Sequence, residues 1–127
     1  RKEPLISGKE PSDIAPIVAK TLIGDVNNKN VYDQLVDSMN RLHKFSYIKS
    51  IEASVKSDHT DILSKINVPT LVVVGELDSL TPPSLANEIA NEIPGAKLEI
   101  ITGAGHLSNI EQPEIFNSKV TKFLNEL

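Results

Sequence analysis

The sequence lacks several residue patterns that identify particular classes of protein. It contains no cysteine among its 127 residues, which excludes disulfides, thiolate catalysis and cysteine-based zinc sites. No apolar run approaches the roughly 20 residues that a membrane-spanning helix needs. No signal-peptide pattern opens the chain either. We therefore expect a cytoplasmic protein with no membrane partner.

Basic clusters and metal-ligand spacing are also missing. The chain has 13 Lys and Arg against 17 Asp and Glu, a formal net charge of −4. This balance argues against a nucleic-acid partner, since such proteins carry clustered Lys and Arg. The three histidines, His43, His59 and His106, are scattered and do not have the spacing of a metal site. The sequence thus predicts no metal and no cofactor.

Residues 68–78 form the stretch around which the rest of the chain is organised. Leu71 and the three valines after it are consecutive and apolar, and three of the four are β-branched. Such a run predicts a strand of a parallel sheet that is covered on both faces. Gly75 ends the run and Asp78 follows it. In open parallel sheets ligands bind beyond the carboxyl ends of the strands, so Asp78 lies where chemistry is expected.

The remainder of the C-terminal half alternates between strand and helix patterns. Strands are predicted over residues 70–75 and 97–101. Thr81 is predicted to cap the first helix, with Leu85, Ile89 and Ile93 on its inner face, and Pro113 begins the second helix. A strand–helix–strand unit is a right-handed crossover, so the two strands should be parallel. The fold class expected from this order is α/β.

The N-terminal half shows only helical patterns. Helices are predicted over residues 13–23, 30–44 and 47–56, the first capped by Ser12 and the third by Ser46, with a short helical turn before residue 66. Residues 1–11 read as a loop or tail because of their prolines and glycine. The chain is therefore expected to divide into an all-helical segment, residues 1–66, and a βαβα segment, residues 67–127.

Two residues with complementary chemistry follow the two predicted strands. Asp78 comes after the first strand and His106 after the second, in a turn that contains Gly103 and Gly105. Neighbouring parallel strands would bring their carboxyl ends about 5 Å apart. A carboxylate that hydrogen-bonds an imidazole fixes its tautomer and makes it a competent general base. Either residue alone could equally be a turn cap or a surface residue, but their equivalent placement favours function.

Residues 66–82, Ile-Asn-Val-Pro-Thr-Leu-Val-Val-Val-Gly-Glu-Leu-Asp-Ser-Leu-Thr-Pro, resemble the acid-bearing strand of the α/β-hydrolase superfamily. Residues 93–97 and 103–117 resemble its histidine loop and final helix. The run His-Leu-Ser-Asn-Ile-Glu-Gln-Pro-Glu, which begins at His106, is most similar to 3-oxoadipate enol-lactonases and related small esterases. The resemblance implies that Asp78 is the acid and His106 the base of a catalytic triad. It also implies that residues 1–66 are the helical cap of such an enzyme.

The sequence departs from this family at the nucleophile. The triad serine of α/β-hydrolases lies in a Gly-x-Ser-x-Gly elbow, and the six glycines, at positions 8, 24, 75, 95, 103 and 105, do not make one. A glycine-rich oxyanion loop is absent too. Since the chain begins with Arg1 rather than Met, we expect the C-terminal portion of a longer ester or lactone hydrolase, inactive alone. The alternative is a non-catalytic remnant or interaction module that folds by self-association.

A sheet of only two strands leaves an apolar edge unpaired. The strand that begins near Leu71 has a composition suited to burial on both faces and both edges. An exposed apolar edge invites pairing with another chain. The expected partners are therefore the missing N-terminal half or a second copy in a homodimer, and the expected substrate of the complete enzyme is a small-molecule ester or lactone.

Overall fold

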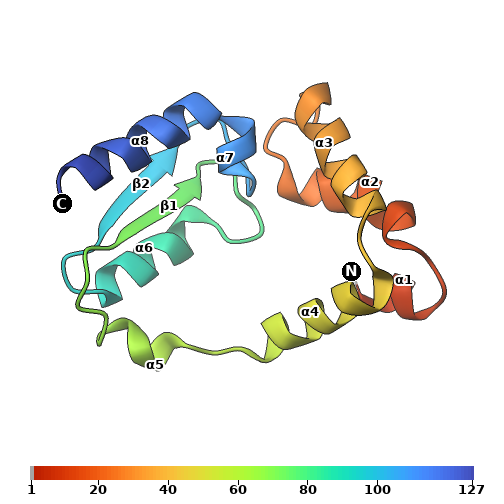
Figure 1. Cartoon of the computed structure of the whole chain (residues 1–127), viewed down its shortest axis with the longest axis horizontal. Coiled ribbons are helices and arrows are strands. Elements are labelled where there is room, and N and C mark those ends of the chain that lie inside the picture. Colours follow the sequence, from red (N-terminus) through yellow and green to blue (C-terminus); the bar gives the residue numbers. More distant parts are fainter. Residues whose placement is uncertain (1) are drawn as a thin grey trace. The chain divides into compact units, whose positions relative to one another are not determined.

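The structure is a computed structural model that describes residues 2–127 as two compact units (Figure 1). The first unit is built from the chain through Thr21 and from Val26–Asp58. The second unit combines a four-residue segment, Leu22–Asp25, with His59–Leu127. Residues 22–25 thus belong with the C-terminal half, although the chain on both sides of them does not.

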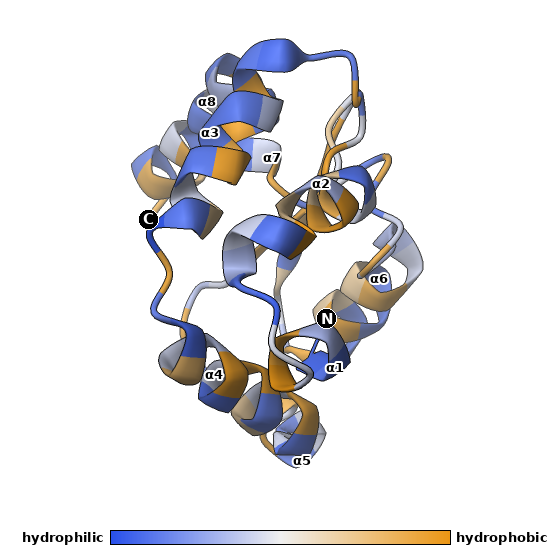
Figure 2. Cartoon of the chain, turned by 90° about the vertical axis from the view of Figure 1, so that its right-hand side faces the viewer, coloured by the Kyte–Doolittle hydropathy of each residue, from blue (hydrophilic) through white to orange (hydrophobic). Residues whose placement is uncertain are grey.

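The first unit is helical throughout. Its helices are α1 (Lys2–Ile6), α2 (Pro11–Leu22), α3 (Lys29–Asn40) and α4 (Lys44–Lys56), and Figure 2 shows their hydrophobic residues. Their buried side chains include Leu5, Ile14, Ala15, Val18, Ala19, Val31 and Met39. Across residues 2–127, each helix is too short or too polar to cross a membrane.

The loop predicted for residues 1–11 is wrong, because residues 2–6 form α1. Pro4 is compatible with this helix since it lies in the first turn, where amide groups have no intrahelical partner. Helix α2 also begins earlier than predicted, at Pro11, so Ser12 lies within it and does not cap it. The Asp13 carboxylate instead accepts a hydrogen bond from the Glu10 amide at 2.7 Å, which marks the start of the helix.

The boundary between the next two helices also differs from the prediction. Helix α3 ends at Asn40 rather than at residue 44, and α4 begins at Lys44, so Ser46 does not occupy the cap position. The N-cap position of α4 is occupied by His43, and the Ser46 hydroxyl lies 3.0 Å from Nδ1 of His43. None of the described residues of α4 is buried, and its apolar residue Val55 is 82% exposed.

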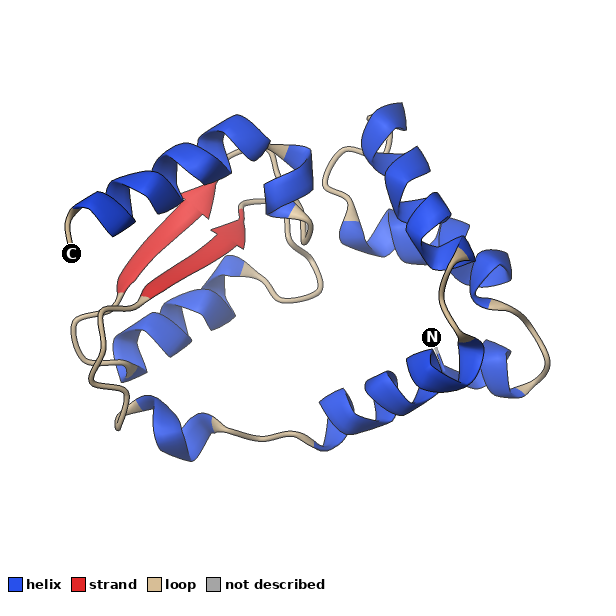
Figure 3. Cartoon of the chain, viewed as in Figure 1, coloured by secondary structure: helices blue, strands red, loops and turns tan. Residues whose placement is uncertain are grey.

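The second unit contains the two strands, and they are parallel as predicted. Strand β1 (Leu71–Gly75) pairs with β2 (Lys97–Ile101), with Leu71 opposite Lys97 and Gly75 opposite Ile101 (Figure 3). The helices of this unit are α5 (Thr60–Leu63), α6 (Pro83–Glu92), α7 (Ser108–Glu111) and α8 (Pro113–Asn125). This order confirms the predicted α/β class.

Packing around the strands is incomplete within the described chain. Helix α6 packs against both strands and α8 against β2 (Figure 1). The buried apolar residues here are Val74, Ala86, Ile93, Ile101 and Ala104. Of the residues expected on the inner face of α6, only Ile93 is buried, whereas Leu85 and Ile89 are 43% and 41% exposed. In strand β2, Ile100 is 46% exposed. Apolar surface that a larger sheet would cover is therefore accessible.

Candidate active site

The loops that follow the two strands are joined to each other by backbone hydrogen bonds. The Glu76 amide donates to the Ile101 carbonyl at 3.0 Å, and the Leu77 amide donates to the Ala104 carbonyl at 2.8 Å. The Glu76 carboxylate accepts the Gly103 amide at 2.9 Å. These contacts hold the carboxyl ends of β1 and β2 together, so residues that follow them share one edge of the sheet.

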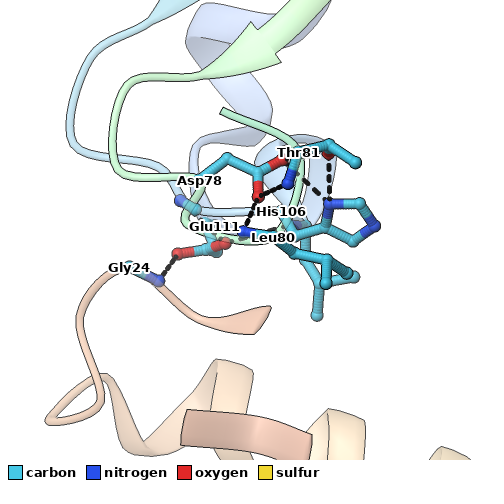
Figure 4. Close-up of polar contacts among 8 residues, drawn as sticks. Gly24, Asp78, Leu80, Thr81, His106 and Glu111 are labelled. Carbon is cyan, nitrogen blue, oxygen red and sulfur yellow. Dashed lines mark hydrogen bonds and ion pairs between the residues drawn. The ribbon is translucent and has the colours of Figure 1, made fainter. Parts of the chain in front are cut away.

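Asp78 and His106, singled out from the sequence, are in direct contact at this edge. Nδ1 of His106 lies 2.8 Å from Oδ2 of Asp78 (Figure 4). Asp78 is only 6% exposed, whereas the His106 side chain retains 35% of its accessible surface. The structure thus brings together the predicted pair, with the carboxylate buried and the imidazole at the surface. Their catalytic roles stay a prediction.

Asp78 is surrounded by hydrogen-bond donors from the turn that follows it. Its Oδ1 accepts the amides of Leu80 at 2.9 Å and Thr81 at 3.0 Å, and its Oδ2 accepts the Thr81 hydroxyl at 2.8 Å. Burial acts to raise the pKa of Asp78, but the hydrogen bonds from Thr81, His106 and Leu80 together outweigh it and hold the pKa below its ordinary value. The carboxylate is therefore ionised at neutral pH.

Thr81 has a different role from the one predicted. Helix α6 begins at Pro83 with Pro82 at the cap position, so the Thr81 side chain does not cap it. Its hydroxyl contacts Asp78 and also lies 3.1 Å from Nδ1 of His106. This contact was not predicted from the sequence, although hydroxyl side chains shortly after an aspartate commonly bond it locally.

The contact with Asp78 determines what the His106 ring can do. Because Nδ1 faces an ionised carboxylate, we assign the ring proton to Nδ1 and the free lone pair to Nε2. In Figure 4 the second ring nitrogen points away from Asp78. No hydrogen bond joins it to another residue in the part of the chain that the structure describes. Nε2 is therefore available to accept a proton from a group brought to it.

A hollow of about 330 Å³ opens beside this pair. Its walls come from β1, α6, the two loops and the start of α7, and they include Val73, Leu85, Ile89, Thr81, His106 and Ser108. The aliphatic walls and the polar pair at one end are typical of a binding site. His106 thus lines a cavity into which a substrate or another segment of protein can enter.

A further carboxylate, which was not predicted from the sequence, lies against the loop that carries His106. Glu111, on α7, is only 8% exposed. Its side chain accepts backbone amides of Gly24, Gly105 and Leu107 (Figure 4). The only sequence signal was an acidic residue shortly after His106, and nothing in the sequence connects it to Gly24.

The remaining histidines do not join the site. His43 and His59 precede α4 and α5, and within residues 2–127 neither is hydrogen-bonded to Asp78 or His106. In the same range, no cluster of three His, Asp or Glu side chains is arranged to hold a metal ion.

The hydrogen bonds to Asp78 predict a pH dependence of stability. Its pKa in the folded chain lies below the ordinary value of 3.8, so the unfolded chain binds the proton more tightly. The stabilisation is complete above that ordinary value and is lost as the pH falls through the folded-state pKa. Below pH 3.8, the free energy of unfolding should fall less steeply with decreasing pH in the Asp78→Asn variant than in the unsubstituted chain. The two slopes should differ by at most about 1.4 kcal/mol per pH unit.

Urea unfolding of the full chain between pH 2 and pH 6 would measure this slope (roughly the range in which carboxylates titrate). Asp61→Asn, which removes an exposed carboxylate on α5, is the matched control. Equal acid slopes for Asp78→Asn and the unsubstituted chain would contradict the assignment of Asp78 as a stabilising carboxylate.

Comparison with known proteins places the chain among hydrolases. The α/β-hydrolase family model Abhydrolase_4, described as TAP-like protein, matches residues 45–127. 3-Oxoadipate enol-lactonase 1 of Acinetobacter baylyi is 29% identical over 124 residues, which cover 93% of this chain. Carboxylesterase YbfK of Bacillus subtilis is 41% identical over 63 residues, or 49% of the chain. The solved enol-lactonase of Burkholderia xenovorans superposes with a TM-score of 0.83 at 28% identity over 89% of the chain.

The chain spans less than half the length of these relatives. It covers 46% of the Acinetobacter enol-lactonase, 21% of the Bacillus carboxylesterase and 44% of the solved Burkholderia enzyme. The part that it matches is the C-terminal portion of α/β-hydrolase structures. The resemblance of residues 66–117 to this superfamily is confirmed.

Proposed function

Because the chain belongs to the TAP-like family of α/β-hydrolases, we propose that it is the acid- and base-bearing portion of a serine-type hydrolase. Asp78 is the triad acid and His106 is the triad base. The nucleophilic serine comes from a portion that the 127-residue sequence does not contain, since that sequence has no Gly-x-Ser-x-Gly elbow. On this proposal the chain alone has no hydrolase activity.

The observation that carries the proposal is the 2.8 Å contact between Asp78 and His106 at the shared edge of two parallel strands. The carboxylate fixes the tautomer that leaves Nε2 unprotonated, and it stabilises the imidazolium that forms once Nε2 has taken a proton. A solvent-exposed ion pair would be mobile and screened, but Asp78 is 6% exposed and is held by further hydrogen bonds.

The proposed reaction uses Nε2 of His106 twice. First, Nε2 removes the proton from the serine hydroxyl as the serine oxygen bonds to the ester or lactone carbonyl carbon. The imidazolium then returns that proton to the leaving alkoxide as the carbon–oxygen bond breaks, which yields an acyl-enzyme and an alcohol. Water, deprotonated by the same nitrogen, then attacks the acyl carbon. The imidazolium gives this proton to the serine oxygen as the bond between that oxygen and the acyl carbon breaks, which releases the acid and restores the serine hydroxyl.

The proposed substrate class is a small-molecule ester or lactone. Relatives of this chain are named as an enol-lactonase and a carboxylesterase, and both reactions need the same acyl transfer to serine. Residues 1–66 are proposed as the helical cap of the enzyme, and the cytoplasmic location expected from the sequence is part of the same proposal.

The proposed partner of the chain is the missing N-terminal half. Strand β1 pairs only with β2 in the described chain, so its other edge is available for a further strand. That edge and the hollow beside His106 share Val72–Val74 as lining residues. A further strand that pairs with this edge in parallel would bring its own carboxyl end toward His106. A second copy of this chain is the alternative occupant, and it would leave the site without a nucleophile.

Complementation with a relative tests the proposed function. The N-terminal portion of the Acinetobacter enol-lactonase would be produced separately and mixed with the full 127-residue chain. We expect hydrolysis of p-nitrophenyl acetate by the mixture and by neither part alone. A fluorophosphonate reagent should label the serine of the added portion only when the chain is present, because the reagent requires an activated nucleophile.

The second candidate function is a non-catalytic module that self-associates, which the exposed apolar residues of β2 and α6 favour. Light scattering of the chain, with and without the added portion, separates the two. If the chain remains a homodimer in the mixture, and the mixture shows neither fluorophosphonate labelling nor ester hydrolysis, the result would favour the non-catalytic module. A mixed complex that remains inactive although folded would count against the hydrolase.

A further inference from the structure

We propose that Glu111 is a positioning residue that fixes the loop carrying His106 by joining it to residues 22–25. The inference rests on the proposed role of His106 as the base of the hydrolase. The hydrogen bonds of the Glu111 side chain to this loop go to backbone amides, so it would act through the backbone on either side of His106.

Glu111 divides its two carboxylate oxygens between two segments of chain. Oε1 accepts the amides of Gly105 at 3.0 Å and Leu107 at 3.1 Å, the residues on either side of His106. Oε2 accepts the amide of Gly24 at 2.7 Å, which is 87 residues away in the sequence. One buried carboxylate therefore ties the histidine loop to a distant segment, and hydrogen bonds to a charged acceptor are stronger than neutral ones.

The backbone of the histidine loop meets residues 22–25 directly. The His106 amide donates to the Leu22 carbonyl at 2.8 Å. A Cβ built on Gly105 would lie 2.5 Å from the Gly24 nitrogen, and one on Gly24 would lie 2.7 Å from the Gly105 nitrogen. The two segments can approach this closely only because both residues are glycine.

All three amides from Gly105 to Leu107 are thus used to hold the loop. Two donate to Glu111 and the one between them donates to Leu22. Since the ring of His106 must keep Nδ1 against Asp78, any rotation of this backbone would lengthen the contact between them. The expected role of Glu111 is therefore to limit that rotation, with residues 22–25 as the anchor.

The test compares two substitutions in the full 127-residue chain by NMR. In Glu111→Gln, the amide oxygen can keep the Gly105 and Leu107 bonds, but its NH₂ group then faces the Gly24 amide. We expect the Gly24 amide to exchange with solvent roughly ten- to a hundredfold faster, with smaller changes at the other two. In Glu111→Ala all three amides should exchange faster. Glu114→Gln, an exposed carboxylate on α8, is the matched control.

A second readout reports the position of His106 itself. The hydrogen-bonded Nδ1 proton gives a separate downfield resonance when it is protected from solvent by the contact with Asp78. We expect this resonance to broaden or vanish in Glu111→Ala, to weaken in Glu111→Gln and to persist in Glu114→Gln. Protection of the strand amides from Val72 to Val74 shows whether each variant remains folded.

Three results would overturn the proposal. One is an unchanged Nδ1 resonance in Glu111→Ala while the Gly24 amide loses protection, which would leave Glu111 a purely structural role. Another is an unchanged rate of solvent exchange at the Gly24 amide in both Glu111 variants. The third is loss of strand protection in the milder Glu111→Gln, which would mean that Glu111 supports the whole unit. None of these readouts needs substrate, so they are independent of whether the complementation assay succeeds.

Discussion

In an enzyme reconstituted from this chain and a nucleophile-bearing portion, His106→Ala should lower kcat by about 10⁴- to 10⁶-fold. Without the imidazole no group takes the serine proton as the oxygen attacks, and the remaining rate depends on substrate binding and carbonyl polarisation alone. Asp78→Asn should lower kcat by about 10⁴-fold, because an amide can hold the ring in the wrong tautomer. Initial rates with p-nitrophenyl acetate would measure both effects.

The double variant gives a sharper result than either single one. Since Asp78 acts only through His106, the combined substitutions should be no slower than His106→Ala alone, as expected for residues that work as a unit. Rate losses that multiply would mean that the two side chains act independently, against the proposed triad. His59→Ala, which removes an exposed histidine before α5, is the control and should retain full activity.

The two strands and the Asp78–His106 contact could be predicted because each depends on a short stretch of sequence. The apolar run from Leu71 has no polar alternation, and its end is marked by Gly75, so a parallel strand could be read directly. Its burial on both faces was also predicted, but of the apolar run only Val74 is buried in the described chain. Strand β2 has the predicted bounds, and the right-handed crossover rule then gave the parallel pairing. Once the strand ends were placed at one edge, the contact of Asp78 with His106 followed from geometry.

The features that could not be predicted depend on contacts between residues far apart in the sequence, or on packing partners that the described chain does not contain. Glu111 accepts the amide of Gly24 across 87 residues, and no sequence pattern signals such a pair. Helix α1 was missed because Pro4 and Gly8 indicate a loop, although tertiary packing that buries Leu5 overrides that weak preference. Leu85 and Ile89 show the helical spacing of an inner face, yet in the described chain they remain 43% and 41% exposed.

Gly75→Ala should destabilise the chain by about 3 kcal/mol or more, at the upper end of what overpacking costs. A Cβ at this position would lie 2.0 Å from the Gly105 carbonyl oxygen and 2.4 Å from that of Ala104. Both atoms belong to the backbone, so no side-chain rotation can relieve the clash. For a chain of this size, the midpoint of thermal unfolding should fall by roughly 10 °C, measured by circular dichroism.

Gly95→Ala separates this clash from ordinary backbone strain. Gly95 has a φ of +73°, and a Cβ added there would have nothing within 4 Å of it, so alanine should cost only about 1–2 kcal/mol for the left-handed conformation. A similar cost at Gly75 would contradict the close approach. The loop that Gly75→Ala would displace leads into His106, since Ala104 and Gly105 immediately precede it. In the reconstituted enzyme, any Gly75→Ala protein that still folds should therefore lose kcat as well, whereas folded Gly95→Ala should keep it.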